Sequence, residues 1–295
     1  MDEKIIKRQL KRITIGSAAV VVLLLVCGAV FWNYFMRSLT QSAVEQMKAE
    51  TAETKGRIEK QMTMDFQVLQ TLAAFIGCRN AMEEEDFPAA LAKANKYNAF
   101  NTMSYFPLEG NGILSMTGQE VEENVPIERL NANARDVIYR SFQGEEAVSR
   151  LFDSMASSEK VFVYSVPVYV DGQIVGALSA SDHIDIFSEI LAGDAVLGGS
   201  GYIHLLGAEG KFLIRSSQAV VKEKGESIFD GPYIQEEETE KVRLAMERQD
   251  AMQTSVQYEG REYLSNLEPV GGNEWEILLS LIHSRPGRLR AVLRV

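Results

Sequence analysis

The stretch Val161-Phe-Val-Tyr-Ser-Val-Pro-Val-Tyr-Val170 is followed by Asp171-Gly172 and then by Gln173-Ile-Val-Gly-Ala-Leu-Ser-Ala-Ser181. Both apolar stretches are rich in β-branched or small residues, which favours strands. Asp-Gly is a preferred pair for a tight hairpin turn. The stretch therefore predicts two long antiparallel strands. Pro167 has no N–H to donate, so the first strand is expected to have an edge or a bulge there.

The same kinds of signal recur on both sides of this hairpin. Upstream, 101–106 and 112–117 flank a turn at 108–111, and 130–142 has helical spacing. A short helix is expected at 184–191. Downstream, the strands expected from the same signals are 202–206, 211–214, 251–258, 261–267 and 275–282, with a helix at 236–248. Hairpin, helix and paired long strands thus occur twice, which predicts two similar modules, 81–192 and 193–282. The junction between them is marked by Gly193, Gly198, Gly199 and Gly201.

A long helix is predicted ahead of both modules, over residues 37–80. Residues 38–80 contain no proline, and Gly56 is the only glycine before Gly77. Apolar residues recur there at three- and four-residue steps, at Ile58, Met62, Leu69, Leu72, Ala73 and Ile76. This stripe has two possible uses: packing against its own domain, or forming the seam of a homodimer.

Residues 13–36 contain no Asp, Glu, Lys or Arg and are long enough to cross a bilayer as a helix. Basic residues gather in the tail 1–12, whereas Arg37 stands alone after the apolar run. The positive-inside rule then places the N-terminus in the cytoplasm and the bulk of the chain outside, with 13–36 in contact with membrane lipid. The alternative is a cleaved signal peptide, but the run is long for one and Trp32-Asn-Tyr-Phe35 is a poor cleavage site.

The composition of the chain argues against several classes of function. The net charge is -11 and residues 1–12 carry five basic and two acidic side chains, so the remainder carries -14, which argues against nucleic acid as a partner. Cys78 is the only cysteine beyond the apolar segment, so the outer part can form no internal disulfide. His183, His204 and His283 show no metal-ligand spacing, and no phosphate loop or catalytic triad is recognisable. We therefore expect neither an enzyme nor a metal or cofactor site.

The order of these segments resembles the double Cache family of extracytoplasmic sensors. The most specific match is Tyr164-Ser-Val-Pro-Val-Tyr169, Asp171-Gly172 and Val175-Gly-Ala-Leu178. The resemblance covers about residues 38–282. It implies an α+β fold with a transmembrane helix, a long outer helix and two PAS-like antiparallel-sheet modules. It also implies a small-molecule ligand in the membrane-distal module, held between the sheet and the helix before the paired strands.

The resemblance assigns four candidate ligand-binding residues: Arg135, Tyr139, Tyr164 and Asp182. Amino-acid-binding members have Arg followed closely by Trp-Tyr on that helix, whereas Val137 and Ile138 follow Arg135 here. The amino-acid motif is therefore incomplete, and no ligand is named. Each candidate also has a structural interpretation: Arg135 on the surface, Tyr139 and Tyr164 in the core or sheet, and Asp182 as a helix cap.

The chain ends in a basic tail, 283–295, whose arginines are incompatible with a second spanning helix: Arg285, Arg288, Arg290 and Arg294. We expect the ligand-sensing module of a bacterial signal-transduction protein without its output domain. The resemblance favours a diguanylate cyclase as that output over a histidine kinase or a chemoreceptor. The alternative is a stand-alone membrane-anchored adaptor that binds a partner through the long helix.

Overall fold

The computed structural model describes residues 3–98, 100–154, 159–191, 201–215, 225–230, 234, 236–258, 261–271 and 275–283. Of the predicted module junction, only Gly201 falls in these ranges, and the predicted tail is described only at His283. The chain divides into two compact units, residues 1–49 and residues 50–295.

The first unit is the N-terminal part of helix α1, which runs from Glu3 to Arg79. Its apolar side chains are exposed, for example Leu25 at 68% and Phe31 at 65%. The most apolar 18-residue window has a mean hydropathy of 2.5, so in length and composition this helix could cross a membrane. A helix that exposes leucines and valines over such a length is unfavourable in water, and this agrees with the predicted membrane span at 13–36.

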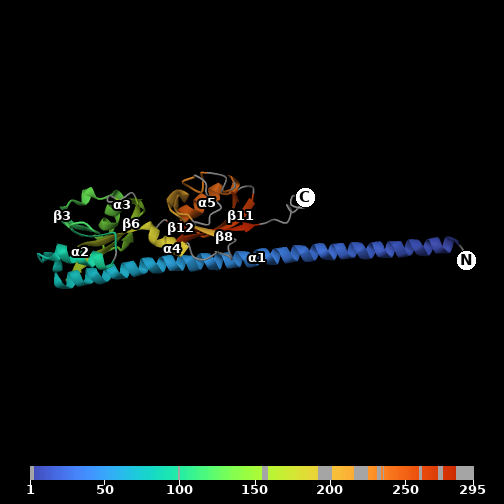
Figure 1. Ribbon diagram of the computed structural model, residues 1–295, viewed down its shortest axis with the longest axis horizontal. Helices are drawn as coiled ribbons and strands as arrows, with labels where there is room; N and C mark the ends of the chain where they lie inside the picture. Colours follow the sequence, from blue (N-terminus) through green and yellow to red (C-terminus); the bar gives the residue numbers. More distant parts are fainter. Residues whose placement is uncertain are drawn as a thin grey trace. The chain divides into compact units, whose positions relative to one another are not determined.

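The second unit contains two antiparallel sheets, and the first of them is built around the predicted hairpin (Figure 1). Strands β6 (Lys160–Val170) and β7 (Gln173–His183) pair from Val161 to Val170, with a register shift between Val168 and Tyr169. The predicted hairpin is therefore confirmed, whereas Pro167 itself is in register with Ala177 and the irregularity lies beyond the next residue. The other strands of this first sheet are β1 (Thr102–Pro107), β2 (Gly112–Met116), β3 (Glu122–Val125), β4 (Ala147–Val148) and β5 (Phe152–Asp153).

The strand order of the first sheet is β3-β2-β1-β7-β6-β4, with β5 also paired to β6. Helix α3 (Ala132–Ser141) covers one face and buries Ala134, Val137 and Ile138. Helix α2 (Phe87–Asn98) was not expected from the sequence, although Pro88 suits the first turn of a helix. Shorter helical segments complete this part: η1 (Ala81–Glu83), η2 (Ile127–Arg129), η3 (Ile184–Phe187) and α4 (Ser188–Leu191).

The second sheet has the order β10-β11-β12-β8-β9. Its strands are β8 (Gly201–Leu206), β9 (Phe212–Ile214), β10 (Met252–Tyr258), β11 (Arg261–Val270) and β12 (Trp275–His283). The turn η5 (Ala208–Gly210) joins β8 to β9, and helix α5 (Glu236–Arg248) packs on the sheet. Val242 and Met246 of α5 share a core with Leu206, Leu267 and Leu278. The fold is therefore the predicted α+β arrangement of two antiparallel sheets after a long apolar helix.

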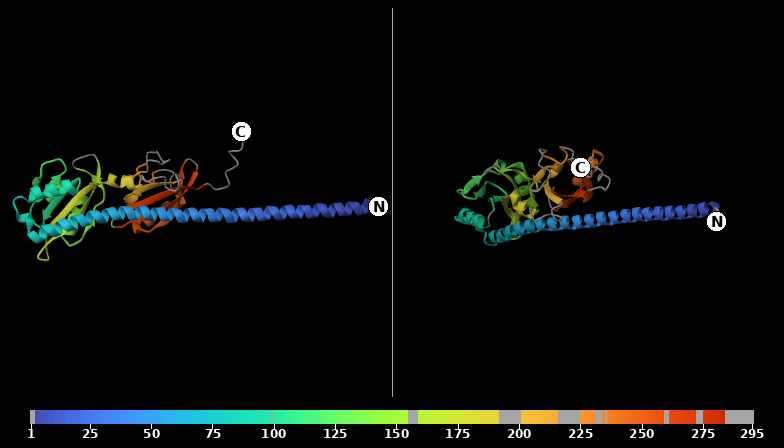
Figure 2. Two further views of the ribbon diagram at one scale, coloured as in Figure 1. Left: turned by 60° about the horizontal axis from the view of Figure 1, so that its bottom comes forward. Right: turned by 45° about the vertical axis from the view of Figure 1, so that its right-hand side comes forward.

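The C-terminal stretch of α1, residues 50–79, lies along both sheets of the second unit (Figures 1 and 2). The ring of Phe66 packs edge-on against Tyr164 of the first sheet, with centroids 5.0 Å apart. Glu59 accepts a hydrogen bond from the backbone N–H of Gly271 at 2.9 Å, next to the second sheet. The predicted apolar stripe is buried, with Ile58 and Leu69 fully inaccessible, so it packs against its own domain.

Candidate ligand-binding site

A cavity of about 340 Å³ lies between the first sheet and helix α3. We call it the α3 cavity. The strands β1, β2, β6 and β7 supply its floor, and α3 with the segment before it supplies its roof. Its lining residues are Asn101, Thr102, Ser104, Leu114, Met116, Gln119, Arg129, Leu130, Asn131, Ala134, Ile138, Phe152, Ser154, Val161, Val163, Ala180 and Ser181. A cavity of this size can enclose a small metabolite.

The period of each element explains why these residues meet. Thr102 and Ser104 are two positions apart on β1, and Val161 and Val163 are two positions apart on β6, so each pair faces the same side of the sheet. On the roof, Ala134 and Ile138 are four positions apart on one face of α3, and Leu130 lies in the segment just before the helix. The small side chain of Ala134 leaves room beneath the helix.

The polar groups of the α3 cavity are mainly hydroxyls and amides. The hydroxyls of Thr102 and Ser181 are hydrogen-bonded at 2.7 Å across the β1–β7 pair. Asn131 caps α3 by accepting from the N–H of Asn133 at 2.9 Å. Arg129 is ion-paired with Glu122 and supplies the positive charge at the rim. No acid is present among the described residues that line the cavity.

Two of the predicted site residues lie on α3 but not in the cavity. Arg135 donates from Nη1 to the backbone oxygen of Glu128 at 3.0 Å. Tyr139 is 45% exposed and packs edge-on against Phe142. Both fall on the flank of α3 because the buried face of the helix is set by Ala134, Val137 and Ile138. The predicted location between sheet and helix contains a cavity, but these two side chains do not line it.

The other two predicted residues, Tyr164 and Asp182, are close to each other on the sheet but away from the cavity. Tyr164 is fully buried and donates from its hydroxyl to Asp65 of α1 at 3.1 Å. Asp182 accepts at Oδ1 from the backbone N–H of His183 at 2.8 Å. Tyr164 alternates with Val163 and Asp182 alternates with Ser181, so the strand period turns both toward the face that packs on α1.

Burial shapes the electrostatics of this opposite face. Burial, opposed by the hydrogen bond from Tyr164 and reinforced by the carboxylate of Asp182, raises the pKa of Asp65 to about 6. Burial also raises the pKa of Asp182. Within the described ranges, no group of three or more His, Cys, Asp or Glu is placed to hold a metal ion.

Comparison with solved structures shows the same fold in bacterial receptors. The ligand-binding domain of the Campylobacter jejuni chemoreceptor Tlp3, in complex with L-norvaline, superposes with a TM-score of 0.64 at 14% identity, covering 83% of this chain and 92% of that one. The ligand-binding domain of the Pseudomonas aeruginosa PAO1 amino acid chemoreceptor PctC, in complex with GABA, gives a TM-score of 0.53 at 16% identity, covering 78% and 96%.

Comparison with curated proteins gives no match. A family model, in contrast, covers most of the chain: the model described as Cache domain matches residues 35–285, which include both sheets and the helix that lies along them. The chain thus belongs to the Cache domain family, with the double-module arrangement that the sequence predicted.

Proposed function

We propose that this chain is the extracytoplasmic ligand-sensing part of a membrane-anchored signalling receptor, and that the α3 cavity is its ligand site. The observation that supports this is the cavity itself, which has a volume of about 340 Å³ and lies between the first sheet and α3. The solved relatives with this fold include ligand-binding domains of chemoreceptors. The role is one of sensing rather than catalysis.

The lining of the α3 cavity suggests the kind of ligand. Leu114, Ile138 and Phe152 offer apolar contact, while Thr102 and Ser181 offer hydroxyls. The described lining contains no carboxylate to hold an ammonium group, and Arg129 stands at the rim. A small neutral or anionic molecule with a short apolar part fits this lining better than an α-amino acid does.

The test is a thermal-shift screen of the full chain against small metabolites, followed by one substitution in the roof. A ligand that binds only the folded state at about 100 times its Kd stabilises it by about 2.7 kcal/mol. Ala134→Leu fills the space beneath α3 and should abolish the ligand-induced shift. Ala132→Leu, the same substitution at the exposed start of α3, should leave it intact. A shift that survives Ala134→Leu would exclude the α3 cavity as the site.

We also propose that residues 13–36 anchor the chain with its N-terminus in the cytoplasm, as the basic tail 1–12 favours. Cys78 is exposed on the second unit and gives a direct test. In a Cys27→Ser background, a membrane-impermeant maleimide should label Cys78 on intact cells. Labelling that requires permeabilised cells would refute this topology.

The output stays a prediction. A diguanylate cyclase is the favoured output, ahead of a histidine kinase or a chemoreceptor, and the alternative is an adaptor that binds a partner through α1. The DNA downstream of the codon for Val295 distinguishes them. An output domain encoded there supports a receptor, and its identity decides among the three.

A further inference from the structure

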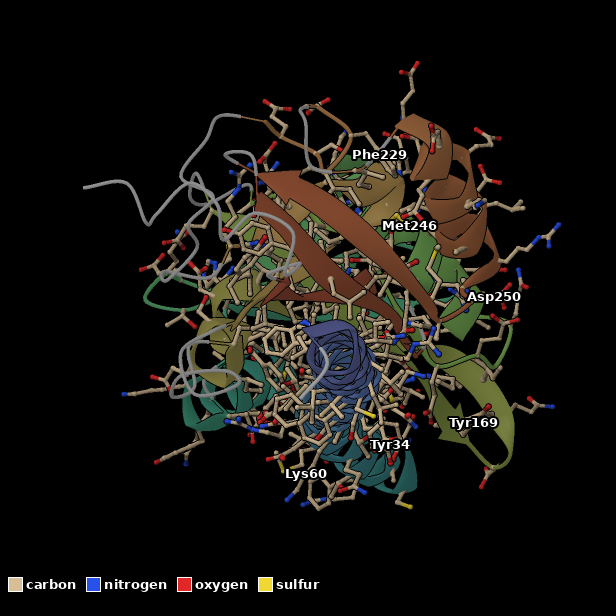
Figure 3. The ribbon with its side chains drawn as sticks, turned by 90° about the vertical axis from the view of Figure 1, so that its right-hand side faces the viewer. Tyr34, Lys60, Tyr169, Phe229, Met246 and Asp250 are labelled. Carbon is tan, nitrogen blue, oxygen red and sulfur yellow. The ribbon has the colours of Figure 1, made fainter. Side chains whose placement is uncertain are left out.

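A second cavity, of about 350 Å³, lies in the part of the chain that carries α5 and the second sheet. We call it the α5 cavity. Phe229 and Met246 supply its apolar surface, and Figure 3 shows both on the side of the second sheet where α5 lies. Its other lining residues are Arg150, Ala208, Glu209, Arg243, Glu247, Gln249 and Glu276.

Glu276 is the one fully buried charged residue in this lining. It lies on β12, opposite Leu206 of β8 and Pro269 of β11, and its exposed fraction is 0%. Its Oε1 accepts from Nε2 of Gln249 across a long 3.4 Å, and its Oε2 has no hydrogen-bond partner among the described residues. A carboxyl oxygen buried without a partner is costly, so this oxygen is available for a donor that the protein does not supply.

The groups next to Glu276 disfavour its ionised form. The C-terminal end of α5, at Arg248, is the negative end of the helix dipole, and Gln249 lies just beyond it. Burial and the nearby carboxylate of Glu268 raise the pKa of Glu276 to about 8. A carboxyl group with this pKa is mostly protonated at neutral pH, and a bound cation favours its ionised form.

The charges that line the α5 cavity indicate the sign of its ligand. Arg150 and Arg243 contribute two positive charges and Glu209 and Glu247 two negative ones, so the lining is neutral while Glu276 is protonated and carries a net of -1 once Glu276 is ionised. Arg243 lies over the ring of Phe229, 4.0 Å from its centroid, and so stays at the wall of the cavity. The complement of this lining is a molecule with one positive charge and a short apolar part.

We propose that the α5 cavity is a second binding site, specific for a small primary ammonium compound. The carboxylate of Glu276 accepts the hydrogen bonds of the ammonium group, and Phe229 and Met246 contact its carbon chain. Gln249 donates from its side chain to Oε1 of Glu276 and to the backbone oxygen of Met246, at 3.2 Å, which leaves Oε2 as the oxygen that accepts from the ammonium group. This site does not depend on the α3 cavity.

The test is isothermal calorimetry of the full chain in phosphatidylcholine nanodiscs, with n-propylammonium as the probe. Binding at pH 7 should release a proton, measured from the dependence of the enthalpy on the ionisation enthalpy of the buffer. Affinity should rise by roughly tenfold from pH 6 to pH 7 and level off above about pH 8, because the ligand no longer has to displace a proton from Glu276. Propanol and propionate, which lack the ammonium group, should bind at least tenfold more weakly.

Glu276→Gln keeps the shape of the side chain but removes its charge. Because the wild-type acid is protonated at pH 7, this variant should fold normally and lose propylammonium affinity by tenfold or more, with no proton release. Glu240→Gln, the same substitution on the exposed surface of α5, should bind as the wild type does. The proposal is overturned if Glu276→Gln binds propylammonium equally well, if propionate binds more tightly, or if the wild type does not bind propylammonium at millimolar concentration.

Discussion

Tyr164 of β6 donates its phenolic hydrogen to Oδ2 of Asp65 of α1, with the two oxygens 3.1 Å apart. Asp65 also accepts at Oδ1 from Nε2 of Gln61 at 3.0 Å. Val163, next to Tyr164 in the strand, points the other way and lines the α3 cavity. One strand thus contacts the cavity on one face and the long helix on the other. A ligand that shifts β6 would move the Tyr164–Asp65 contact with it.

This buried pair predicts a pH-dependent stability. The pKa of Asp65 is raised to about 6, so the folded state holds that proton more tightly than the unfolded chain does. The resulting stabilisation is complete below about pH 4 and is lost as the pH rises through 6. Asp65→Asn, which cannot ionise, should therefore gain about 1 to 2 kcal/mol over the wild type on going from pH 4 to pH 8.

Urea unfolding of both proteins across this range measures the effect. Asp182, whose pKa is also raised by burial, changes stability with the same sign and remains in both proteins. Asp136→Asn, on the exposed surface of α3, is the matched control and should show no such change. An Asp65→Asn difference that is the same at pH 4 and pH 8 would contradict the assignment.

Two glycines in α1 should respond in opposite directions to the same substitution. A Cβ on Gly77 would lie 2.0 Å from the backbone oxygen of Tyr169, whereas a Cβ on Gly56 would meet nothing within 4 Å. Gly56→Ala should stabilise the chain by up to about 1 kcal/mol through helix propensity. Gly77→Ala should destabilise it, because the helix and the β6–β7 turn cannot keep their present contact. The melting temperature should rise for Gly56→Ala and fall for Gly77→Ala, each compared with the wild type. A rise in both would mean that the end of α1 can move away from Tyr169 at no cost in stability.

The helices and strands of this fold were predictable where a short stretch of sequence shows a clear hydrophobic period or turn motif. The hairpin β6–β7 follows from its β-branched runs and its Asp-Gly turn, and α3 follows from its helical spacing. Strands β4 and β5 have two residues each, too few for a period, and were missed. Helix α2 was missed because its large apolar residues are few and, of these, only Phe87 and Leu91 are buried in it, which leaves a weak helical period.

The lining of the α3 cavity was harder to predict, because it depends on which face of each strand or helix a residue occupies. On a strand, a slip of one position moves a side chain to the other face, and this separates Tyr164 from Val163 and Asp182 from Ser181. On α3, the apolar Val137 and Ile138 set the buried face and turn Arg135 to the flank. A stricter use of the helical period would have drawn attention to Ala134, but the space beneath it depends on tertiary packing that no local pattern encodes.

Phe187, in η3, should be one of the costliest side chains to remove. Its ring stacks on Phe162 of the first sheet at 5.8 Å and meets Trp275 of the second sheet edge-on at 5.6 Å, and its exposed fraction is 0%. Phe187→Ala should lower the free energy of unfolding by about 3 to 5 kcal/mol. Tyr97→Ala, at a side chain of α2 that is 77% exposed, should change it by less than about 0.5 kcal/mol. Urea titration followed by tryptophan fluorescence reports on both, and equal losses would show that the aromatic cluster is not a shared core.

The predicted homodimer can be tested at a free thiol that the chain already carries. The apolar stripe of α1 is buried against its own sheets, so a dimer has to use the outer face of the helix, where Met64 and Phe75 are 43% and 57% exposed. Cys78 is exposed and follows Met64 by two heptads, which places both on one seam. In a parallel pair, the two copies of Cys78 would come within disulfide range.

Mild oxidation of a Cys27→Ser variant in membranes should therefore give a disulfide-linked dimer on a non-reducing gel. Moving the thiol about 80° round the helix, by Gln70→Cys with Cys78→Ser, should abolish the link, since Gln70 bonds to Glu146 of its own chain at 2.7 Å. Equal cross-linking from both positions would mean random collision, and the outer face of α1 would then not be a dimer seam.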